Sequence, residues 1–507
     1  SSSSAWSGVG VLSLIVLLLN LSLPVHAMQR LLLSAACAGS AAALRLAKDA
    51  PPLSVADSYG NYWSAARGSS LFHGMSPLVG PRFERNEQVD NTSKLWAFDH
   101  PVHAFHSIPL GVVVDGEKNV YVTMDTTLFK LSPNSTILWE WWPDHKDNWI
   151  TTAPALEGDK LYLTTSNGKV WAISARDGAE VWTKKIAHRN NITDRGIMGV
   201  QDGMLIATFN STEDYEYEQD HGGNGFVGAF SSENGDLKWM MKPLAPTSSF
   251  APCFPGDGTV VFQDREGTAY SHELKTGKQR WVMVGEADTF TRGFPVVANG
   301  IVYTVISNVS SPRGYKDEVD GHSPGWLTAR NVADGSLVWR KHLDMPPDST
   351  PVVGRLPGRS ELSIVQPTGY TRQNGTTAIY AFDALTGEEQ WTFEGPELKQ
   401  RLAAGIEETT FARFLGFASE VEPKAGPWGS PLIDAAGTVY VGGQDGYLYT
   451  LRDENLDGTI SGINELSYID TGLAPLNINS PAIIPGMFLF PHMSTVVSFK
   501  SPEVPLA

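Results

Sequence analysis

Short runs of alternating apolar and polar residues fill most of the chain after about residue 90, and such alternation is typical of β-strands that bury one face. Two runs stand close together in KLYLTTSNGKVWAI (160–173) and in TVYVGGQDGYLYTL (438–451), each pair separated by a Gly-containing turn. A shorter apolar run, such as GFPVVANG (293–300), precedes these pairs. A final run that ends in Trp follows most of them. The pattern predicts repeated units of four short strands, lettered a to d in chain order.

Strand d is the most regular part of this repeat. Weaker copies of it end at Trp139 and Trp96. In the five best copies a Gly stands four residues before the Trp. A tight turn between strands c and d needs a residue with positive φ, which Gly adopts without steric cost. The five copies are AISARDGAEVW (172–182), AFSSENGDLKW (229–239), SHELKTGKQRW (271–281), ARNVADGSLVW (329–339) and AFDALTGEEQW (381–391).

Successive Trp residues of this series are 42 to 58 residues apart, and four strands repeated at such a period are typical of a β-propeller. The C-terminal run 479–500 offers three further strands, and the run around Trp96 offers the missing fourth. We therefore expect an all-β, eight-bladed β-propeller of four-stranded blades. Pairing of the N- and C-terminal strands would close it and leave no open sheet edge. The seven other blades are predicted at 106–142, 153–185, 198–242, 251–284, 293–343, 349–394 and 429–471.

One copy of the repeat carries a specific resemblance. The pattern Ala381-x-Asp383-x-x-Thr386-Gly387-x-x-x-Trp391 resembles the tryptophan-docking motif of the PQQ-repeat propellers. That family includes the quinoprotein alcohol dehydrogenases and the non-catalytic BamB-type assembly propeller of bacterial outer membranes. The resemblance covers roughly residues 90–500 and implies that the motif packs neighbouring blades together. It carries no information about catalysis by itself.

The first part of the chain has the character of a targeting segment. An apolar run at 8–27 ends in Val25-His26-Ala27, which fits a small-residue cleavage site, and Met28 opens a second candidate, so the true start stays open. Both alternatives direct the protein to the secretory-pathway lumen or the extracellular space. A retained membrane anchor at 9–27 is a further alternative, against which Pro24 argues. The predicted division is a targeting segment at 1–50, an N-terminal extension at 51–90, the propeller at 91–500 and a tail at 501–507.

Charge and cysteine content exclude two classes of protein. A net charge of −17 and a pI of about 5.1, with no cluster of Lys and Arg, argue against a nucleic-acid partner. Only Cys37 and Cys253 are present, and Cys37 lies in the targeting segment, so we expect no disulfide framework. Cys253 is predicted to be a small, buried apolar side chain.

Asn-x-Ser/Thr sequons support a secretory route, and a used sequon must lie on an exposed loop. Unused sequons in a bacterial protein are the alternative. The predicted glycosylation sites are Asn91, Asn134, Asn191, Asn210, Asn308 and Asn374.

Long insertions gather on one predicted face of the propeller. In this architecture the b–c and d–a loops share one face, and the c–d and a–b turns share the other. The c–d turns are short, whereas the insertions fall in b–c and d–a loops. Elaborated loops on a rigid scaffold are the usual place for recognition, so we expect a protein or glycan partner on this face, and a membrane contact only if the N-terminal segment is retained. The insertions are 209–225, 307–326, 367–377 and 392–429.

The clearest metal-binding pattern is DENLDGTISGINE, residues 453–465. The loop resembles an EF-hand calcium loop, because residues with side-chain oxygens stand at alternate positions and Gly458 is the sixth residue. In such a loop the oxygens converge on one cation and the Gly permits a sharp turn. The pattern departs from an EF-hand because position 12 is Asn464, the acid comes one residue later, and flanking helices are not expected. We predict a structural calcium site in the c–d turn of blade 7, with a polar Asx-rich turn as the alternative. The predicted ligands are Asp453, Asn455, Asp457, the carbonyl of Thr459, Ser461 and Glu465.

Other polar residues carry weaker signals. His100, His103 and His106 could bind zinc or copper, but their spacing is not diagnostic in a loop, and a packed or solvated loop is favoured. Arg195 and Arg292 each precede an inner strand and could hold an anionic ligand in the central funnel. Capping or surface roles are favoured for both.

Two functions from different classes remain. The resemblance implies that the family's enzymes hold PQQ over the funnel beside a calcium ion that polarises the quinone, with a carboxylate as base. This chain lacks the adjacent cysteine pair that forms one wall of many such sites, and no trio of calcium ligands is evident near the funnel. The favoured prediction is a non-catalytic secretory or extracellular propeller. A PQQ- and calcium-dependent quinoprotein dehydrogenase that oxidises alcohols or sugars is the alternative.

Overall fold

The computed structural model describes most of the chain from residue 54 to residue 503. The targeting segment predicted at 1–50 lies outside the described residues. No helix in the described part is long and apolar enough to cross a bilayer. The gaps inside the described part are 84–86, 89–92, 102–108, 146–147, 191–195, 211–223, 248, 309–323, 348, 370–374, 399–426, 473, 476–478 and 493.

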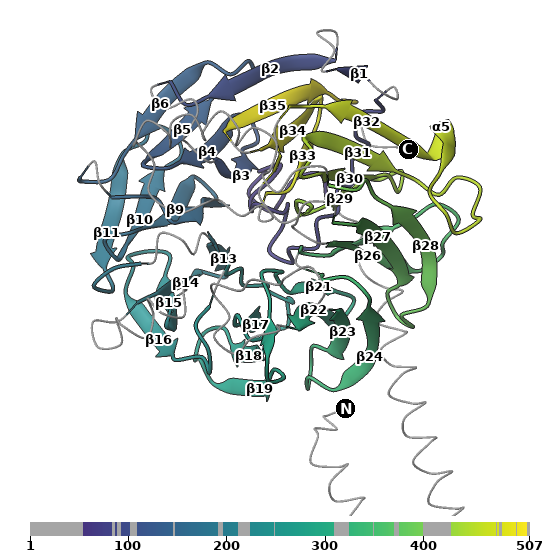
Figure 1. Ribbon diagram of the computed structural model, residues 1–507. Helices are drawn as coiled ribbons and strands as arrows, with labels where there is room; N and C mark the ends of the chain where they lie inside the picture. Colours follow the sequence, from purple (N-terminus) through teal and green to yellow (C-terminus); the bar gives the residue numbers. More distant parts are fainter. Residues whose placement is uncertain are drawn as a thin grey trace, which may run out of the picture. The chain divides into compact units, whose positions relative to one another are not determined.

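Eight antiparallel blades follow one another around a ring, as predicted (Figure 1). Blade 1 contains β3 (Pro109–Val114), β4 (Val120–Met124), β5 (Thr127–Leu131) and β6 (Ile137–Trp141), and blade 2 contains β8 (Ala155–Glu157), β9 (Lys160–Thr165), β10 (Lys169–Ser174) and β11 (Glu180–Lys185). Blade 3 contains β13 (Gly199–Gln201), β14 (Met204–Phe209), β15 (Phe226–Ser231) and β16 (Leu237–Met241). Blade 4 contains β17 (Thr259–Gln263), β18 (Ala269–Glu273) and β19 (Gln279–Met283), with a single bridge from Cys253 to Val261 on its inner side.

The second half of the ring repeats this order. Blade 5 contains β21 (Val296–Ala298), β22 (Ile301–Asn308), β23 (Gly325–Asn331) and β24 (Leu337–Leu343), and β20 (Thr289–Phe290) also pairs with β22. Blade 6 contains β25 (Val352–Arg355), β26 (Leu362–Gly369), β27 (Thr377–Asp383) and β28 (Glu389–Glu394). Blade 7 contains β29 (Leu432–Ile433), β30 (Val439–Gly442), β31 (Tyr447–Leu451) and β32 (Leu466–Asp470), and blade 8 contains β33 (Ala482–Ile484), β34 (Met487–Pro491) and β35 (Thr495–Lys500).

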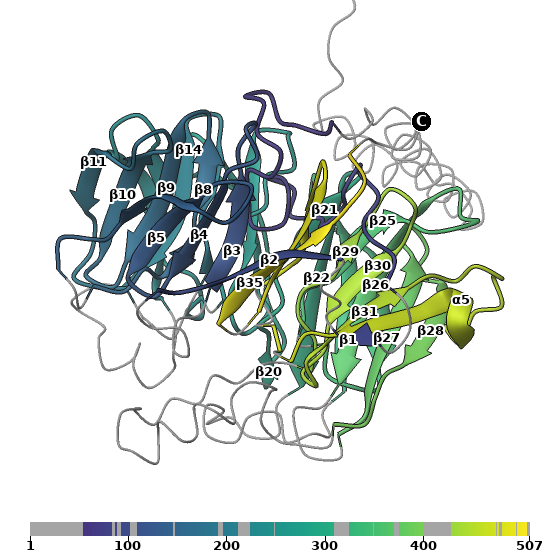
Figure 2. The same ribbon diagram turned by 90° about the horizontal axis from the view of Figure 1, so that it is seen from above.

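The N-terminal strand closes the ring. Strand β2 (Lys94–Asp99) pairs antiparallel with β35 and supplies the outer strand of blade 8, as the sequence predicted (Figure 2). Just before it, the two-residue strand β1 (Glu87–Gln88) pairs in parallel with β32 of blade 7. The chain therefore joins its two ends through two neighbouring blades.

The glycine of each strong repeat packs on the Trp of the preceding blade. All five glycines have φ between +70° and +73°, so the turn predicted from the sequence is confirmed. At Gly277 an added Cβ would lie 2.5 Å from Trp239 Cγ, and at Gly387 it would lie 2.8 Å from Trp339 Cδ2. A side chain has no room at these positions. The docking role that the resemblance implied is therefore visible in the packing.

Burial decreases from the axis of the propeller to its rim. Every residue of β4 is buried, and so is every residue of β17. In β6, by contrast, no residue is fully buried. The middle strands pack against blades on both sides, whereas strand d has one side in water. The core therefore lies between blades and near the axis.

Candidate functional site

Residues 63–81, termed the channel segment, run along the inner strands of six blades, inside the ring of Figure 1. Its carbonyl groups accept hydrogen bonds from the inner strands as a strand neighbour would. The bonds join Val114 N to Trp63 O (2.8 Å), Leu156 N to Ser64 O (3.0 Å), Phe254 N to Ser70 O (3.0 Å), Val297 N to Leu71 O (3.3 Å), Val353 N to His73 O (3.0 Å) and Ile433 N to Gly74 O (3.0 Å).

Side chains of the channel segment fill the space enclosed by these strands. Phe72 is fully buried and belongs to one apolar cluster with Ala65 and Ala66. The same cluster takes in residues from several blades, so it spans the axis of the propeller and is not confined to one blade. Its members from the inner side of the ring include Leu110, Ala153, Ile197, Ala251, Phe294 and Ala474.

Arg67 is the charged residue at this centre, and it is fully buried. Its Nε donates to Phe72 O at 3.0 Å and its Nη2 donates to Pro351 O at 2.7 Å. Nη1 has no hydrogen-bond partner among the described residues. Burial lowers the pKa of Arg67 to about 9, because the charged form has lost its water. Burial, with the nearby Arg67 charge, also lowers the pKa of His73 to about 4.

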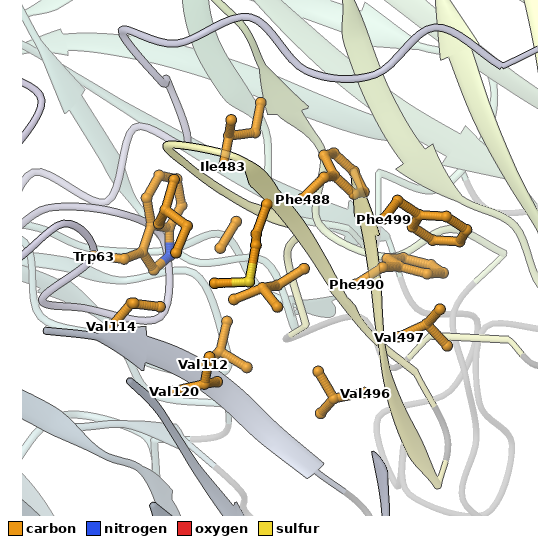
Figure 3. Packing of buried hydrophobic residues seen from close by; sticks show 14 of the residues in the cluster. Trp63, Val112, Val114, Val120, Ile483, Phe488, Phe490, Val496, Val497 and Phe499 are labelled. Atoms are coloured by element: carbon orange, nitrogen blue, oxygen red, sulfur yellow. The ribbon is translucent and has the colours of Figure 1, made fainter. Parts of the chain in front are cut away.

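The channel segment also covers the seam where the ring closes. Figure 3 shows the Trp63 ring beside Val114 of blade 1 and Ile483 of blade 8. Trp63 and Val114 exchange both backbone hydrogen bonds, at 3.0 and 2.8 Å. The segment therefore holds together the two blades that are farthest apart in the sequence. Sequence patterns did not reveal this role, because the segment has no repeat and no clear periodicity.

Exposed apolar residues stand where three outer strands run into d–a loops. Trp142 follows β6, Leu244 follows β16 and Val284 follows β19, and their side chains are 57%, 65% and 70% exposed. These positions lie on the predicted loop-rich face. An isolated exposed apolar residue has no periodic signal, so the sequence alone does not identify these three positions. Most of the four insertions on that face lie outside the described residues.

The loop 453–465 forms a closed structure around two buried carboxylates. Asp453 is 1% exposed and Glu465 is 6% exposed. Glu465 Oε1 accepts a hydrogen bond from Asn455 N at 3.3 Å, and Oε2 accepts one from Ser461 N at 3.1 Å. The loop ends in a one-turn helix, α5 (Gly462–Glu465), where no helix was expected. This turn carries Glu465 back into the loop, although its position is one residue late for an EF-hand.

The remaining predicted ligands face away from that centre or bond within the loop. Asp457 is exposed, and its Oδ1 accepts from Thr459 N at 2.9 Å. Asn455 Oδ1 accepts from Asp457 N at 2.8 Å. Gly458 has φ +85°, in agreement with the sharp turn expected there. Within the described residues no three His, Cys, Asp or Glu side chains gather as metal ligands, so calcium binding stays a prediction.

Predicted glycosylation sites differ in their surroundings. Asn134 is exposed in a turn, which suits a glycan. Asn308 is half-buried at the end of β22. Asn210 is 1% exposed and its Oδ1 accepts from Gly225 N at 3.1 Å, which argues against a glycan there. Glycosylation itself stays a prediction, and three further sites lie outside the described residues: Asn91, Asn191 and Asn374.

The weaker sequence candidates have ordinary packing roles where they are described. His100 is buried with its ring edge-on to Phe129, 5.2 Å between centroids. Arg292 lies over the Phe290 ring at 5.3 Å. Cys253 is fully buried and its Sγ donates to Pro295 O at 2.8 Å, so the predicted buried thiol is confirmed. The other candidates, His103, His106 and Arg195, lie outside the described residues.

Comparison with curated proteins finds distant relatives of two kinds. BamB, an outer membrane protein assembly factor, from Burkholderia pseudomallei (strain K96243) is 23% identical over 241 residues, 47% of this chain and 54% of that protein. The dehydrogenase subunit of alcohol dehydrogenase (quinone) from Gluconacetobacter polyoxogenes is 24% identical over 306 residues, 55% of this chain and 38% of that protein. The chain thus spans about half or less of the length of these curated relatives.

Solved structures of both kinds share the fold. BamB from Moraxella catarrhalis superposes with a TM-score of 0.51 and 14% identity, covering 82% of this chain and 99% of that one. Quinohemoprotein alcohol dehydrogenase from Comamonas testosteroni gives 0.56 and 12%, covering 90% and 84%. A family model described as outer membrane protein assembly factor BamB matches residues 87–222 and 223–350, together just over half of the chain. With its eight blades and docking Trp residues, the chain belongs to this PQQ-repeat, BamB-like family of β-propellers.

Proposed function

We propose that the chain is a non-catalytic propeller of the secretory pathway or extracellular space that binds a partner through its b–c and d–a loop face. The observation that carries this proposal is the filled centre of the ring. The channel segment places Phe72 and Arg67, both fully buried, where a funnel would otherwise stay open. A rigid, filled propeller is a scaffold that presents loops, which suits recognition better than chemistry.

The residues at the centre do not fit a PQQ site. PQQ is a quinone with three carboxylates, and the resemblance places a calcium ion beside it. The side chains of Leu110, Ala153 and Phe294 on the inner side of the ring are apolar, and within the described residues no three His, Cys, Asp or Glu side chains gather to hold the calcium ion.

Two observations keep the dehydrogenase alternative worth testing. Relatives named alcohol dehydrogenase (quinone) match up to about half of this chain. Arg67 is a buried cation whose Nη1 has no hydrogen-bond partner among the residues that the structure describes, and a cation of this kind can attract a carboxylate. The test adds PQQ and calcium to the purified full chain and measures binding by calorimetry and dye-linked oxidation of alcohols and sugars. The scaffold proposal expects neither; stoichiometric binding with turnover would overturn it.

The partner is proposed to be a protein that contacts Trp142, Leu244 and Val284. Exposed apolar side chains on a rim of loops are typical of protein interfaces, in which aromatic residues contribute most of the binding energy. A glycan partner is the alternative, because an exposed Trp ring also stacks on a sugar. The N-terminal targeting segment and the sequons support a location in the secretory pathway or outside the cell. A mass shift on enzymatic removal of N-glycans from the secreted protein would test this location.

The binding face can be tested with matched variants. The triple variant Trp142→Ser, Leu244→Ser, Val284→Ser changes the loop-rich face. The control Val181→Ser, Leu237→Ser, Leu337→Ser changes exposed apolar residues at the opposite ends of outer strands. Crosslinking in the native secretory compartment should give a specific product with the wild type and the control, and lose it with the first variant. Equal loss with both variants would refute the assignment of the face.

A further inference from the structure

The junction between blades 6 and 7 lacks a bond that joins most neighbouring blades. At five of the eight junctions the Trp Nε1 of strand d donates to a backbone carbonyl of the next blade, and strand d of blade 7 contains no Trp. Trp391 Nε1, by contrast, is buried without a hydrogen-bond partner among the described residues. The five bonds are Trp96 to Pro133 O (2.9 Å), Trp182 to Ser232 O (3.2 Å), Trp239 to Leu274 O (2.8 Å), Trp281 to Val332 O (2.7 Å) and Trp339 to Ala384 O (3.0 Å).

Trp139 Nε1 is also buried and has no hydrogen-bond partner in the described part of the chain, but other groups join its junction. There the acceptor carbonyl, Ala175 O, receives Tyr121 OH at 3.0 Å and Lys130 Nζ at 2.9 Å. These bonds replace the indole bond between blades 1 and 2. The junction between blades 6 and 7 needs a replacement of its own.

The loop 453–465 supplies that replacement. It reaches from blade 7 to the outer strand of blade 6, where Thr392 N donates to Gly458 O at 3.0 Å and Ile460 N donates to Thr392 O at 3.1 Å. Ile460 is buried in the apolar cluster that contains Trp391. The short c–d turns of other blades make no such backbone pairing with the preceding blade among the described residues. This loop, residues 453–465, therefore joins blade 7 to blade 6 and is termed the clasp.

The clasp encloses two buried carboxylates, Asp453 and Glu465, which the described part of the protein balances only in part. Asp453 is 1% exposed, and neither of its carboxylate oxygens has a well-formed hydrogen bond to a residue that the structure describes. Its one described counter-charge is Arg359, whose Nη2 lies 3.6 Å from Oδ2. A buried carboxylate in this state is costly unless a cation binds it.

We propose that Asp453 and Glu465 bind one calcium ion, and that this ion stabilises the junction between blades 6 and 7 in place of an indole hydrogen bond. Two carboxylates with amide, hydroxyl and carbonyl oxygens from the same loop form the oxygen-rich set that calcium prefers. A calcium ion with six ligands would also need the side chains of Asn455 and Asp457. These side chains must then leave their hydrogen bonds within the loop and turn toward Asp453. This inference goes beyond the proposed function and does not depend on the partner.

The first test uses the full chain in EDTA and in millimolar calcium. Calcium should raise the melting temperature by several degrees and slow hydrogen exchange in peptides that contain Thr392 and Ile460, while magnesium at the same concentration does much less. Terbium should bind with stoichiometry near one and be sensitised by nearby aromatic rings. If calcium changes neither the melting temperature nor exchange at the clasp, the proposal is wrong.

Variants separate calcium binding from the ion pair with Arg359. Asp453→Asn and Glu465→Gln should each weaken terbium and calcium binding by about 100-fold or more and remove the calcium-dependent rise in melting temperature. Arg359→Gln should keep that rise, because it removes only the alternative counter-charge. Asp334→Asn, in the exposed c–d turn of blade 5, is the matched control and should behave as the wild type. A calcium response that survives Asp453→Asn would refute the site.

Discussion

Gly387 and Gly300 give a direct test of how blades are held together. Both glycines lie in turns with positive φ, +73° and +74°. A Cβ added at Gly387 would lie 2.8, 2.9 and 3.1 Å from Cδ2, Cε3 and Cγ of Trp339, whereas at Gly300 nothing lies within 4 Å. The two Gly→Ala substitutions therefore share the backbone strain and differ in the contact between blades.

The expected effects follow from these distances. The left-handed conformation costs an alanine about 1–2 kcal/mol, partly offset by about 0.4–1 kcal/mol because alanine restricts the unfolded chain. Gly300→Ala should therefore destabilise the protein by about 0–1.6 kcal/mol. Gly387→Ala should cost about 1–3 kcal/mol more, because the Trp339 ring must move in a packed junction. With unfolding entropy of about 2.1 cal/mol/K per residue over about 450 residues, 1 kcal/mol corresponds to about 1 °C.

The assay is differential scanning calorimetry of both variants at neutral pH. Gly387→Ala should melt about 1–3 °C below Gly300→Ala. Adding Trp339→Leu to each variant should reduce that difference, since the clashing ring is gone. Equal melting temperatures for the two single variants would refute the docking explanation, and an unchanged difference in the Trp339→Leu background would show that the ring is not its cause.

Three further predictions concern single groups. Trp281→Phe removes the 2.7 Å hydrogen bond to Val332 O and should lower the free energy of unfolding, measured by calorimetry, by about 1–3 kcal/mol. Trp391→Phe should lower it less, because Trp391 Nε1 has no described partner; equal losses would contradict this. Burial lowers the pKa of His492 to about 3, so its contribution to stability is full above about pH 6.5 and is lost as the pH falls toward 3. Because buried carboxyl groups with raised pKa values act in the opposite direction, the test compares His492→Leu with the wild type, and the variant should lose less stability between pH 7 and 5. The Cys253 thiol, whose pKa burial raises, should react with a thiol reagent only after unfolding; rapid labelling of the native protein would contradict its placement.

Much of the ring could be predicted because each blade repeats a local signal. Gly387 and Trp391 belong to a pattern that fixes the c–d turn and strand d within eleven residues. The role of Trp96 was also predictable, since strand β35 lacked an outer neighbour and the Trp matched the series. In each case the physical cause of the structure lies in neighbouring residues or in the repeat period.

The channel segment and the blade 7 clasp could not be derived in the same way. Arg67 and Phe72 are buried by strands that come from distant parts of the chain, and nothing in their immediate neighbours predicts it. Glu465 reaches the loop interior only because α5 adds a turn that the EF-hand pattern does not contain. Asn210 belongs to a sequon, yet its side-chain Oδ1 accepts a hydrogen bond from the backbone N–H of Gly225. Tertiary contacts over long sequence distances decided these cases.

The path of the channel segment has a consequence for how the protein is made. Residues 63–81 and strand β2 are synthesised early, but their partners extend to Lys500 at the other end of the chain. At about 5–20 residues per second, they wait on the order of tens of seconds for those partners. Until synthesis ends, an apolar stretch with Trp63 and Phe72 has no complete binding site. A segment that leaves the ribosome before any blade is thus among the last to fold, and a truncation anywhere before blade 8 should leave it open to chaperones and proteases.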